Sequence, residues 1–390
     1  MIRGKNMTLL QIMKYLNFKV NKRSLFDIDI TKQSAFLRKF DKPKDLKERS
    51  YFQYICQNML NGRLHTLLYN IASFFLVLPI IAKFMVNQNK VIINTSVDAV
   101  STMDFRKAEL LGKSLNNEFN TIVEINSLPG KLDMNDIKYI MSIIKRYPFS
   151  PYFYLKCISR IALYSDAIKT YNPKAVLAYA EYSYTSSILT EYCRKNNVQH
   201  INIMHGEKLF DIRDSFVCFD RYYVWDQHYI NLLITLGADV NKFIIELPNA
   251  LYLDIKKNIE YLYDMTYYLG SESESDLLKI CKSLKSTGIK LDKICIRYHP
   301  RYSNISRIKS IFNGFVIEDP NKVKLSDSLS MSRYIVSLYS TVLFQALLSD
   351  KDIIVDDTSN ISNYQKLQEM MYIVLNKPHI LMSDFINNCN

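Results

Sequence analysis

Apolar and polar positions follow two patterns along this chain of 390 residues. The first stretch, about 88 residues long, has the character of helices and includes a cluster of charged side chains at 42–49. After it come short apolar runs rich in β-branched residues, KVIINTS (90–96) and NTIVEIN (120–126), which are typical of buried strands. The pattern therefore predicts a helical N-terminal region, residues 1–88, ahead of a part that is built on a sheet.

A strand, a helix and a second strand then follow one another within about 30 residues. The predicted segments are PKAVLAYA (173–180), a strand; SYTSSILTEYCRKNN (183–197), a helix; VQHINIM (198–204), a strand; and RYYVWD (221–226), the next strand. A strand–helix–strand unit requires neighbouring strands to run parallel. We therefore expect a Rossmann-like domain over residues 89–250.

The alternation is repeated from about residue 262 onward. The predicted strands are MTYYLGS (265–271), KICIRYHP (293–300), GFVIEDP (314–320), RYIVSLYS (333–340) and KDIIVDD (351–357), and the predicted helices are 273–288, 325–332 and 341–350. The segment ELPNALYLD (246–254) contains Pro and Asn and is predicted to be the linker. The expected fold class is α/β: two Rossmann-like domains that face a cleft, the second at 251–390, with a helical N-terminal extension.

Charge and cysteine content narrow the class of protein. The net charge of +12 suits an anionic ligand, an anionic membrane surface or nucleic acid. The basic residues are dispersed and no nucleic-acid recognition motif is evident, so we do not expect a nucleic-acid partner. The seven cysteines form neither a C-x-x-C pair nor a zinc-spaced cluster. They indicate reduced thiols in a cytoplasmic protein.

The most apolar stretch is TLLYNIASFFLVLPIIA, residues 66–82. It carries no charge and is close to the short limit for a membrane span, but Pro79 interrupts it. A buried helix, an element at a membrane surface and a true span all remain open. We accordingly keep a peripheral contact with the cytoplasmic face of the inner membrane as an alternative to a purely cytoplasmic protein.

Candidate chemistry lies just after predicted strands, where parallel sheets collect ligands. In IRYHPRYS, Arg297 and His299 are two residues apart on a strand, and Pro300 ends that strand. Together with Arg301 they would form a phosphate clamp. The alternative is a histidine at a strand end among ordinary surface arginines.

Ser340 and Thr341 lie where a predicted strand leads into a helix. Their hydroxyls and the free N–H groups of the helix start would bind an anion. Simple capping of the helix is the competing interpretation. Gly270, at the end of another predicted strand, is assigned to the same nucleotide site.

The third group is Met204-His205-Gly206-Glu207, at the end of a predicted strand in the first domain. Gly206 would permit a positive φ or a close approach by a ligand. Glu207, and after it His205, would serve as general base. The alternative is a turn glycine between surface polar residues.

This layout resembles that of GT-B glycosyltransferases. His299-Pro300, followed about 40 residues later by Ser340-Thr341, resembles the bacterial sialyltransferases of capsule and lipooligosaccharide synthesis. Those enzymes have an acidic pair before a glycine where this chain has His205-Gly206. His-Gly at that position is similar to the teichoic-acid glycerophosphotransferases, which use CDP-glycerol, and the Kdo transferases share the general arrangement.

The resemblance implies a metal-independent glycosyltransferase that uses a CMP-sugar, CMP-sialic acid or similar, to extend a bacterial O-antigen, capsule or lipooligosaccharide. His299 and Pro300 would lie at the nucleotide, with Ser340 and Thr341 at its phosphate. The acceptor would be a glycan or a lipid-linked glycan, and Asp211, Arg213 and Asp214 would hold the acceptor or the donor carboxylate. No cofactor or metal is expected, because Asp27-Ile28-Asp29, which has D-x-D spacing, falls in the helical N-terminal region.

Two alternatives remain. One is a CDP-glycerol phosphotransferase of teichoic-acid-like polymers. The other is a non-catalytic protein, either a polybasic binding protein or a scaffold of a surface-polymer assembly.

Overall fold

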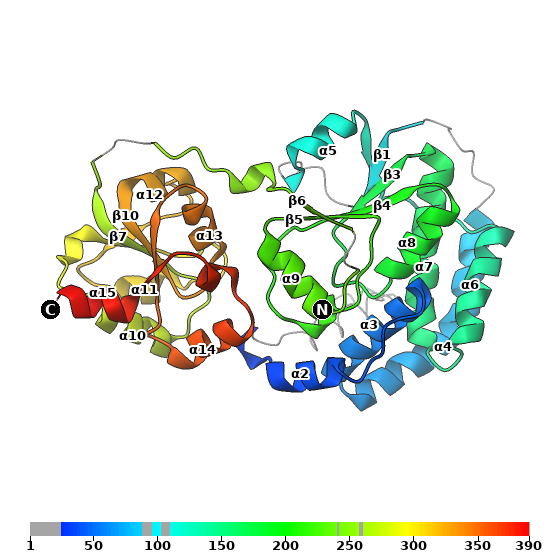
Figure 1. Ribbon diagram of the computed structural model, residues 1–390, viewed down its shortest axis with the longest axis horizontal. Coiled ribbons are helices and arrows are strands. Elements are labelled where there is room, and N and C mark those ends of the chain that lie inside the picture. Colours follow the sequence, from blue (N-terminus) through cyan, green and yellow to red (C-terminus); the bar gives the residue numbers. More distant parts are fainter. Residues whose placement is uncertain (1–24, 88–95, 103–109, 240–241, 257–259, 390) are drawn as a thin grey trace, which may run out of the picture. The chain divides into compact units, whose positions relative to one another are not determined.

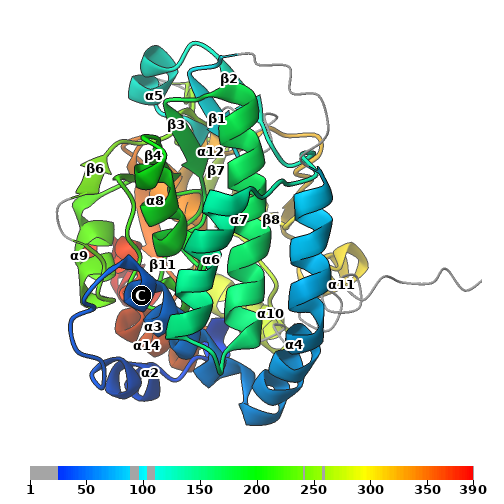
Figure 2. The same cartoon turned by 90° about the vertical axis from the view of Figure 1, so that its right-hand side faces the viewer.

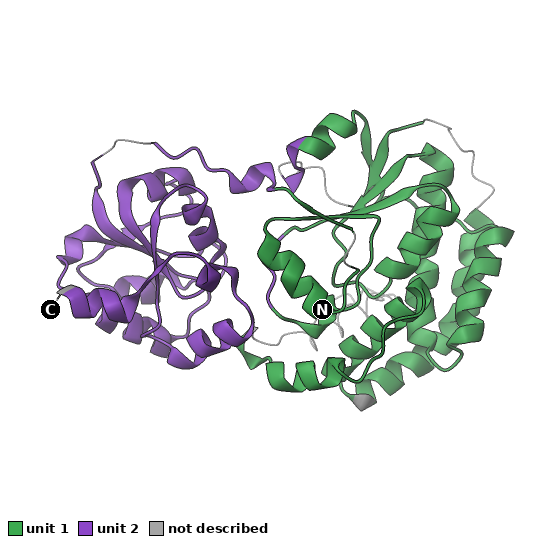
Figure 3. Ribbon diagram, in the orientation of Figure 1, with its two compact units in different colours: residues 1–108, 114–205, 210–246 green, residues 109–113, 206–209, 247–390 purple. Residues whose placement is uncertain are grey.

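The computed structural model describes residues 25–87, 96–102, 110–239, 242–256 and 260–389. They form two compact units (Figures 1 and 3). The N-terminal unit contains the described residues up to Glu246, except for two short segments, 110–113 and 206–209, which group with the C-terminal unit from Leu247 onward. The change from one unit to the other falls within the predicted linker, in which 249–251 form a short 3-10 helix.

The N-terminal unit is a parallel six-stranded sheet with the order β2-β1-β3-β4-β5-β6. Its strands are β1 (Ala99–Ser101), β2 (Ile122–Glu124), β3 (Ala175–Ala178), β4 (Gln199–Ile203), β5 (Arg221–Val224) and β6 (Phe243–Ile245). Its helices are α2 (Ile30–Leu37), α3 (Leu46–Asn61), α4 (Arg63–Val86), α5 (Lys113–Glu118), α6 (Met134–Arg146), α7 (Pro151–Tyr171), α8 (Ser186–Lys195) and α9 (Gln227–Thr235). The expected strand at 90–96 lies outside the described residues except for Ser96, which is not in a strand.

The C-terminal unit is a second parallel six-stranded sheet, with the order β12-β11-β10-β7-β8-β9. Its strands are β7 (Tyr263–Tyr268), β8 (Ile294–Arg297), β9 (Val316–Glu318), β10 (Ser332–Ser337), β11 (Asp352–Val355) and β12 (Ile380–Leu381). Its helices are α10 (Glu274–Lys285), α11 (Ile305–Ile311), α12 (Leu325–Met331), α13 (Thr341–Leu347), α14 (Ile361–Glu369) and α15 (Met382–Cys389). Numbered from β7, the order is that of the Rossmann fold, whose topological switch point lies between β7 and β10.

The predicted α/β class with two Rossmann-like sheets is therefore confirmed. Every expected strand within the described residues is present, with boundaries that differ from the prediction by at most three residues. The sequence pattern missed β1, β6 and β12, which are only three, three and two residues long.

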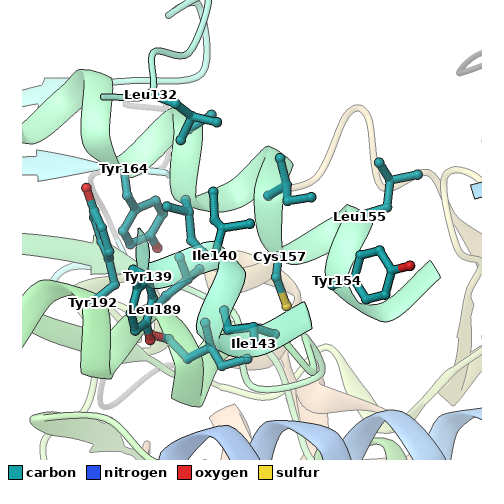
Figure 4. Packing of buried hydrophobic residues seen from close by; sticks show 14 of the residues in the cluster. Leu132, Tyr139, Ile140, Ile143, Tyr154, Leu155, Cys157, Tyr164, Leu189 and Tyr192 are labelled. Carbon is teal, nitrogen blue, oxygen red and sulfur yellow. The ribbon is translucent and has the colours of Figure 1, made fainter. Parts of the chain in front are cut away.

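The helical N-terminal region is not a separate appendage, because it packs into the core of the N-terminal unit. The Nε2 of Gln53 on α3 donates 2.8 Å to the carbonyl of Glu181, and Ser50 Oγ accepts from the backbone N–H of Ile188 at 2.9 Å. Both bridge α3 to residues that follow β3. Buried aromatic and aliphatic side chains of α3, α6, α7 and α8 share one apolar cluster (Figure 4).

Helix α7 is central to that cluster. Pro151 occupies its first turn, and Asn172, in the left-handed conformation at φ 42°, ends it. Thirteen of its 21 residues are buried, and α4 and α6 lie against it (Figure 2). Helix α6 begins with a capping box in which Asp133 and Asp136 each accept a backbone N–H of the other.

The cysteine side chains that the structure describes, Cys56, Cys157, Cys193, Cys218, Cys281 and Cys295, are free thiols and all are buried.

Candidate functional site

In the N-terminal unit the loops after β3 and β4 bring a carboxylate to a histidine. These strands are neighbours in the sheet, so their carboxyl ends lie side by side. Nδ1 of His205, after β4, lies 3.1 Å from Oε1 of Glu181, after β3. The distance is that of an ion pair, although the ring is not aligned for a hydrogen bond.

The Glu181 carboxylate is held in place by the protein. Its side chain is completely buried, and its Oε2 accepts from Nδ2 of Asn202 at 3.1 Å. Asn202 in turn accepts from the N–H of Ala180 at 2.7 Å, so the loop after β3 is tied to β4. The sequence analysis missed Glu181, although its position just after a strand is the same signal that selected His205.

The His205 ring is 29% exposed and has aromatic neighbours. Its centroid lies 4.8 Å from that of Tyr179 and 6.0 Å from that of Tyr182. A carboxylate near Nδ1 favours the tautomer with the proton on Nδ1 and leaves Nε2 as an acceptor. An imidazole in this tautomer can accept a proton at Nε2.

A pocket of about 590 Å³ adjoins this pair within the N-terminal unit. Tyr182 links the two, because it lines the pocket and also lies against His205. The lining is rich in aromatic, amide and charged side chains, from the N-terminal helices, the start of α7 and the loops after β3 and β4. Its members include Asp27, Asp29, Gln57, Asn61, Tyr152, Lys156, Tyr184, Asp211 and Arg213. Such a lining can bind a polyhydroxylated ligand through hydrogen bonds and ring contacts.

Two of the predicted acceptor residues, Asp211 and Arg213, line this pocket. They pair with each other: Nη2 and Nε of Arg213 donate to Oδ2 of Asp211 at 2.6 and 2.9 Å. The guanidinium is thus already neutralised, and its role as a free anion clamp does not follow from the structure. Asp214 is buried and ends the 3-10 helix Ile212–Asp214.

The residues after His205 belong to the other unit. Glu207 lies in the segment 206–209 that groups with the C-terminal unit, and its carboxylate oxygens are shielded from solvent without a hydrogen-bond partner. Burial raises its pKa to about 8, so the carboxyl holds its proton at pH 7. Burial and, after it, the charge of Glu207 raise the pKa of Tyr339, which follows β10.

Of the two roles predicted for Gly206, a positive φ and a close approach by a ligand, the first is not found. Its φ is not in the left-handed region, and a Cβ placed on it would meet no atom within 4 Å. Open space next to the backbone is nevertheless what a ligand would need there.

In the C-terminal unit the turn after β8 fixes the imidazole of His299. The backbone N–H of Arg301 donates to Nδ1 of His299 at 3.1 Å, and the backbone N–H of His299 donates to Ser303 Oγ at 2.9 Å. The ring stacks on Tyr302 at 4.4 Å. Because Nδ1 accepts, the proton of the neutral ring is on Nε2. Burial and then the charge of Arg301 lower the pKa of His299, so the ring is a neutral donor at pH 7.

The structure corrects the position and role of Arg297. Strand β8 ends at Arg297, so His299 lies beyond it and the two residues do not share a strand face. Arg297 is buried, forms an ion pair with buried Glu318 and donates 3.0 Å to the carbonyl of Val323. Its guanidinium is occupied within the sheet, which leaves the exposed Arg301 beside Pro300 as the cation of this turn.

Two other predicted anion-binding groups of this unit, those of Ser340 and Gly270, also have internal partners. Ser340 accepts from the N–H of Val342 at 3.2 Å and so caps α13, which begins at Thr341. The Gly270 N–H donates to both carboxylate oxygens of Glu272 at 2.8 Å, so it is not free for a phosphate. Ser303 Oγ donates to the Gly270 carbonyl at 3.3 Å and ties the His299 turn to the end of β7.

Within the described residues no three His, Cys, Asp or Glu side chains are grouped so that they could hold a metal ion.

Comparisons with known proteins return distant structural likenesses. No protein-family model matches the chain, and no curated protein matches it. Among solved structures it is similar to the wall teichoic acid polymerase TagF, with 12% identity, a TM-score of 0.42, and 84% of this chain and 88% of that chain covered.

The chain is likewise similar to a UDP-GlcNAc 2-epimerase from Neisseria meningitidis bound to UDP-GlcNAc. Here the identity is 10%, the TM-score 0.39, and the coverage 82% of this chain and 88% of that chain. A UDP-GlcNAc 2-epimerase from Methanocaldococcus jannaschii, in complex with UDP-GlcNAc and UDP, shows 14% identity, a TM-score of 0.38, and coverage of 73% and 94%. At TM-scores of this size the matches do not define the function of this chain.

Proposed function

We propose that this protein is a transferase that moves a group from a nucleotide-activated donor to a hydroxyl of a glycan acceptor in the synthesis of a bacterial surface polymer. The N-terminal unit binds and activates the acceptor, and the C-terminal unit binds the donor nucleotide. One observation carries the proposal: each sheet holds a histidine at its carboxyl edge, His205 with a carboxylate at Nδ1 and His299 with an N–H at Nδ1.

For the acceptor, we assign the role of general base to His205, with Glu181 as its positioning residue. Nε2 takes the proton from the acceptor hydroxyl, and Glu181 stabilises the imidazolium that forms. The acceptor is held in the adjoining pocket. The raised pKa of Glu207 argues against it as the base, because its carboxyl is protonated at pH 7.

For the donor, we assign His299 and Arg301 to the phosphate and Pro300 to the rigid turn that carries them. The Nε2–H of His299 donates a hydrogen bond to a phosphate oxygen, where negative charge develops as the nucleotide leaves. Ser340 and Thr341 remain proposed phosphate contacts. They follow β10, which lies next to β7 across the switch point. With a CMP-sugar, the acceptor oxygen bonds to the anomeric carbon, the bond from that carbon to the phosphate oxygen breaks, and CMP departs. With CDP-glycerol, the acceptor oxygen bonds to the phosphorus next to glycerol, the bond from that phosphorus to the bridging oxygen breaks, and CMP departs.

The sequence motifs favour a cytidine nucleotide, with CMP-sialic acid or a similar CMP-sugar as the donor. A CDP-glycerol donor is the second candidate, and one observation favours it. Where the sialyltransferases have an acidic residue, this chain has His205, and the carboxylate of Glu181 lies beside that histidine. A histidine before glycine at this position is what the resemblance to the glycerophosphotransferases implies.

A thermal-shift panel of CMP, CDP, UDP, GDP and their sugars tests the proposal. A ligand at 100 times its Kd stabilises by about 2.7 kcal/mol. We expect cytidine nucleotides to raise the melting temperature, and the gain to be reduced in His299→Ala. A panel in which no nucleotide stabilises the protein would overturn the proposal. Release of CMP from CMP-sialic acid with a galactoside acceptor, or from CDP-glycerol, then separates the two donors.

A further inference from the structure

Helix α4 presents a continuous apolar face to solvent. Leu64, Leu67, Leu68, Ile71, Phe74, Phe75 and Leu78 are each between 51% and 77% exposed. Their spacing of three and four residues places them on one side of the helix. Only 17% of the most apolar part of this helix, within residues 64–86, is buried. Of the three alternatives for this stretch, the buried helix is therefore wrong.

The opposite face of α4 is part of the core. Tyr69, Ser73 and Val77 are buried, and the ring of Tyr69 lies 5.0 Å from that of Tyr152 on α7. The helix is also tied by backbone contacts: Asn70 Oδ1 accepts from the N–H of Tyr152 at 3.1 Å, and the Phe84 carbonyl accepts from the N–H of Leu132 at 3.2 Å. The helix is long and apolar enough to cross a membrane. To do so it would have to leave this packing and expose the core, so the structure favours a helix that lies along a surface.

Charge indicates what covers that face. Helices α4, α6 and α7 form one layer (Figure 2) and together carry eight Lys or Arg and two Asp. Both carboxylates, Asp136 and Asp166, are buried and paired with lysines. Arg146 and Lys169 are used in ion pairs with Asp45 and Asp136. Five further cations of the layer are exposed and have no ion pair within the described residues: Lys83, Lys138, Lys145, Lys156 and Arg160. The layer therefore carries an excess of positive charge in addition to the apolar face of α4.

We propose that the exposed face of α4 docks on an anionic lipid bilayer. Its leucines and phenylalanines would enter the headgroup–acyl boundary, and lysines such as the exposed Lys83 would meet lipid phosphates. A second copy of this chain fits less well. A symmetric interface through α4 would bring two like-charged layers together, whereas an anionic bilayer attracts this charge.

The docking face adjoins the proposed acceptor pocket. Asn61, at the end of α3, lines the pocket directly before α4 begins, and Tyr152 both lines the pocket and contacts α4. Docking would therefore hold the pocket beside the bilayer, where the polar head of a lipid-linked acceptor is found. This last step rests on the proposed function, whereas the docking itself does not.

Co-sedimentation with vesicles tests the docking. The full chain is mixed with vesicles of phosphatidylcholine alone or with added phosphatidylglycerol, and compared with Leu67→Glu/Phe74→Glu. The matched control is Leu278→Glu/Ile361→Glu, which changes exposed apolar residues of α10 and α14. We expect binding to the anionic vesicles, weaker binding in high salt, a loss of about tenfold or more in the α4 variant and none in the control.

Equal vesicle binding by the α4 variant and the wild type would overturn the proposal. The proposal would also be overturned if the wild type binds no vesicles but forms a dimer in sedimentation equilibrium, and the α4 variant does not form that dimer. Thermal unfolding checks that the variants fold. Transfer to a water-soluble acceptor should be unchanged in the α4 variant, which separates a failure of docking from a failure of the proposed function.

Discussion

The two histidines at the sheet edges, His205 and His299, differ in the group that meets Nδ1. In the N-terminal unit that group is a buried carboxylate, Glu181, and in the C-terminal unit it is a backbone N–H, that of Arg301. A carboxylate favours a proton on Nδ1 and leaves Nε2 to accept, whereas an N–H donor requires Nδ1 to accept and leaves the proton on Nε2. In the proposed function, the same residue type therefore serves as a base in one unit and as a donor to an anion in the other.

The sheet edges also differ in how much of their polarity is satisfied internally. In the C-terminal unit Arg297, Gly270 and Ser340 all have protein partners. In the N-terminal unit the edge opens on a pocket lined by polar and aromatic side chains. Strand-end position alone therefore does not identify a ligand contact, and the hydrogen-bond partners of each group are needed as well.

The variant His205→Ala tests the difference between the two histidines most strongly. Loss of the base should lower kcat by about 10²- to 10⁴-fold and leave nucleotide affinity unchanged, because the donor is assigned to the other unit. Nucleotide release with saturating donor and acceptor measures it. His379→Ala, a histidine far along the C-terminal sheet from the proposed site, is the control. A His205→Ala protein with full turnover would remove His205 from the mechanism.

Arg297→Met should destabilise the protein by about 3–5 kcal/mol, because it leaves Glu318 buried without its cation. Urea unfolding measures this loss. The double variant Arg297→Met/Glu318→Met should recover most of it, since no buried charge remains. Unchanged stability with weakened nucleotide binding would instead restore Arg297 as a phosphate clamp.

His299→Ala should weaken nucleotide binding by about 10- to 100-fold, the value of a hydrogen bond to a charged group. Calorimetric titration with the best nucleotide of the thermal-shift panel measures this change. His299→Gln, which can present an N–H near the position of Nε2, should recover part of the affinity. If the losses in His299→Ala and His205→Ala fall on the same parameter, the division of roles between the units is wrong.

Glu207→Gln tests the buried carboxyl through pH. The folded pKa is about 8 against a reference value of 4.5, so between these values the folded chain holds a proton that the unfolded chain has lost. Stability contributed by this group therefore falls as pH rises from about 4.5 to about 8.

Since Gln cannot ionise, Glu207→Gln should melt above the wild type at pH 8.5. The interval between 4.5 and about 8 corresponds to about 4–5 kcal/mol at about 1.4 kcal/mol per pH unit. The expected difference is therefore about 10 °C or more, at about 2–4 °C per kcal/mol for a unit of this size. The gap should narrow as the pH falls toward 4.5. Melting curves that differ by the same amount at every pH would contradict a raised pKa.

Gly206→Ala should have the smallest effect, below about 0.5 kcal/mol in the free energy of unfolding. Its φ is ordinary and the added Cβ meets open space. Gly237→Ala is the contrast, because Gly237 has φ +82° and a Cβ there would lie 2.9 Å from the ring of Phe216. A stable Gly206→Ala with weakened acceptor or donor binding would show that a ligand uses that space.

Much of the fold was predictable from the sequence. Strands β3, β4 and β7 to β11 are apolar runs bounded by turn residues, and this local pattern is the same in any fold that contains them. The residues just after these strands, His205 and His299 among them, were predictable for the same reason. Strands β1, β6 and β12 were not predicted. Each has only two or three residues, and such short strands were recognised, as for β2 and β9, only where the sequence pattern extended over a longer run.

The partners of those residues were not predictable. Glu181 and His205 are 24 positions apart and meet only because β3 and β4 are neighbours in the sheet. Arg297 and Glu318 pair for the same reason across β8 and β9.

The sequence by itself determined where strands, helices and their polar ends lie, because local periodicity and turn chemistry act over a few residues. Only the tertiary structure decided which polar groups are neutralised, which histidine nitrogen keeps its proton and which face of α4 is left uncovered. Those outcomes depend on desolvation and on contacts between segments far apart in the chain.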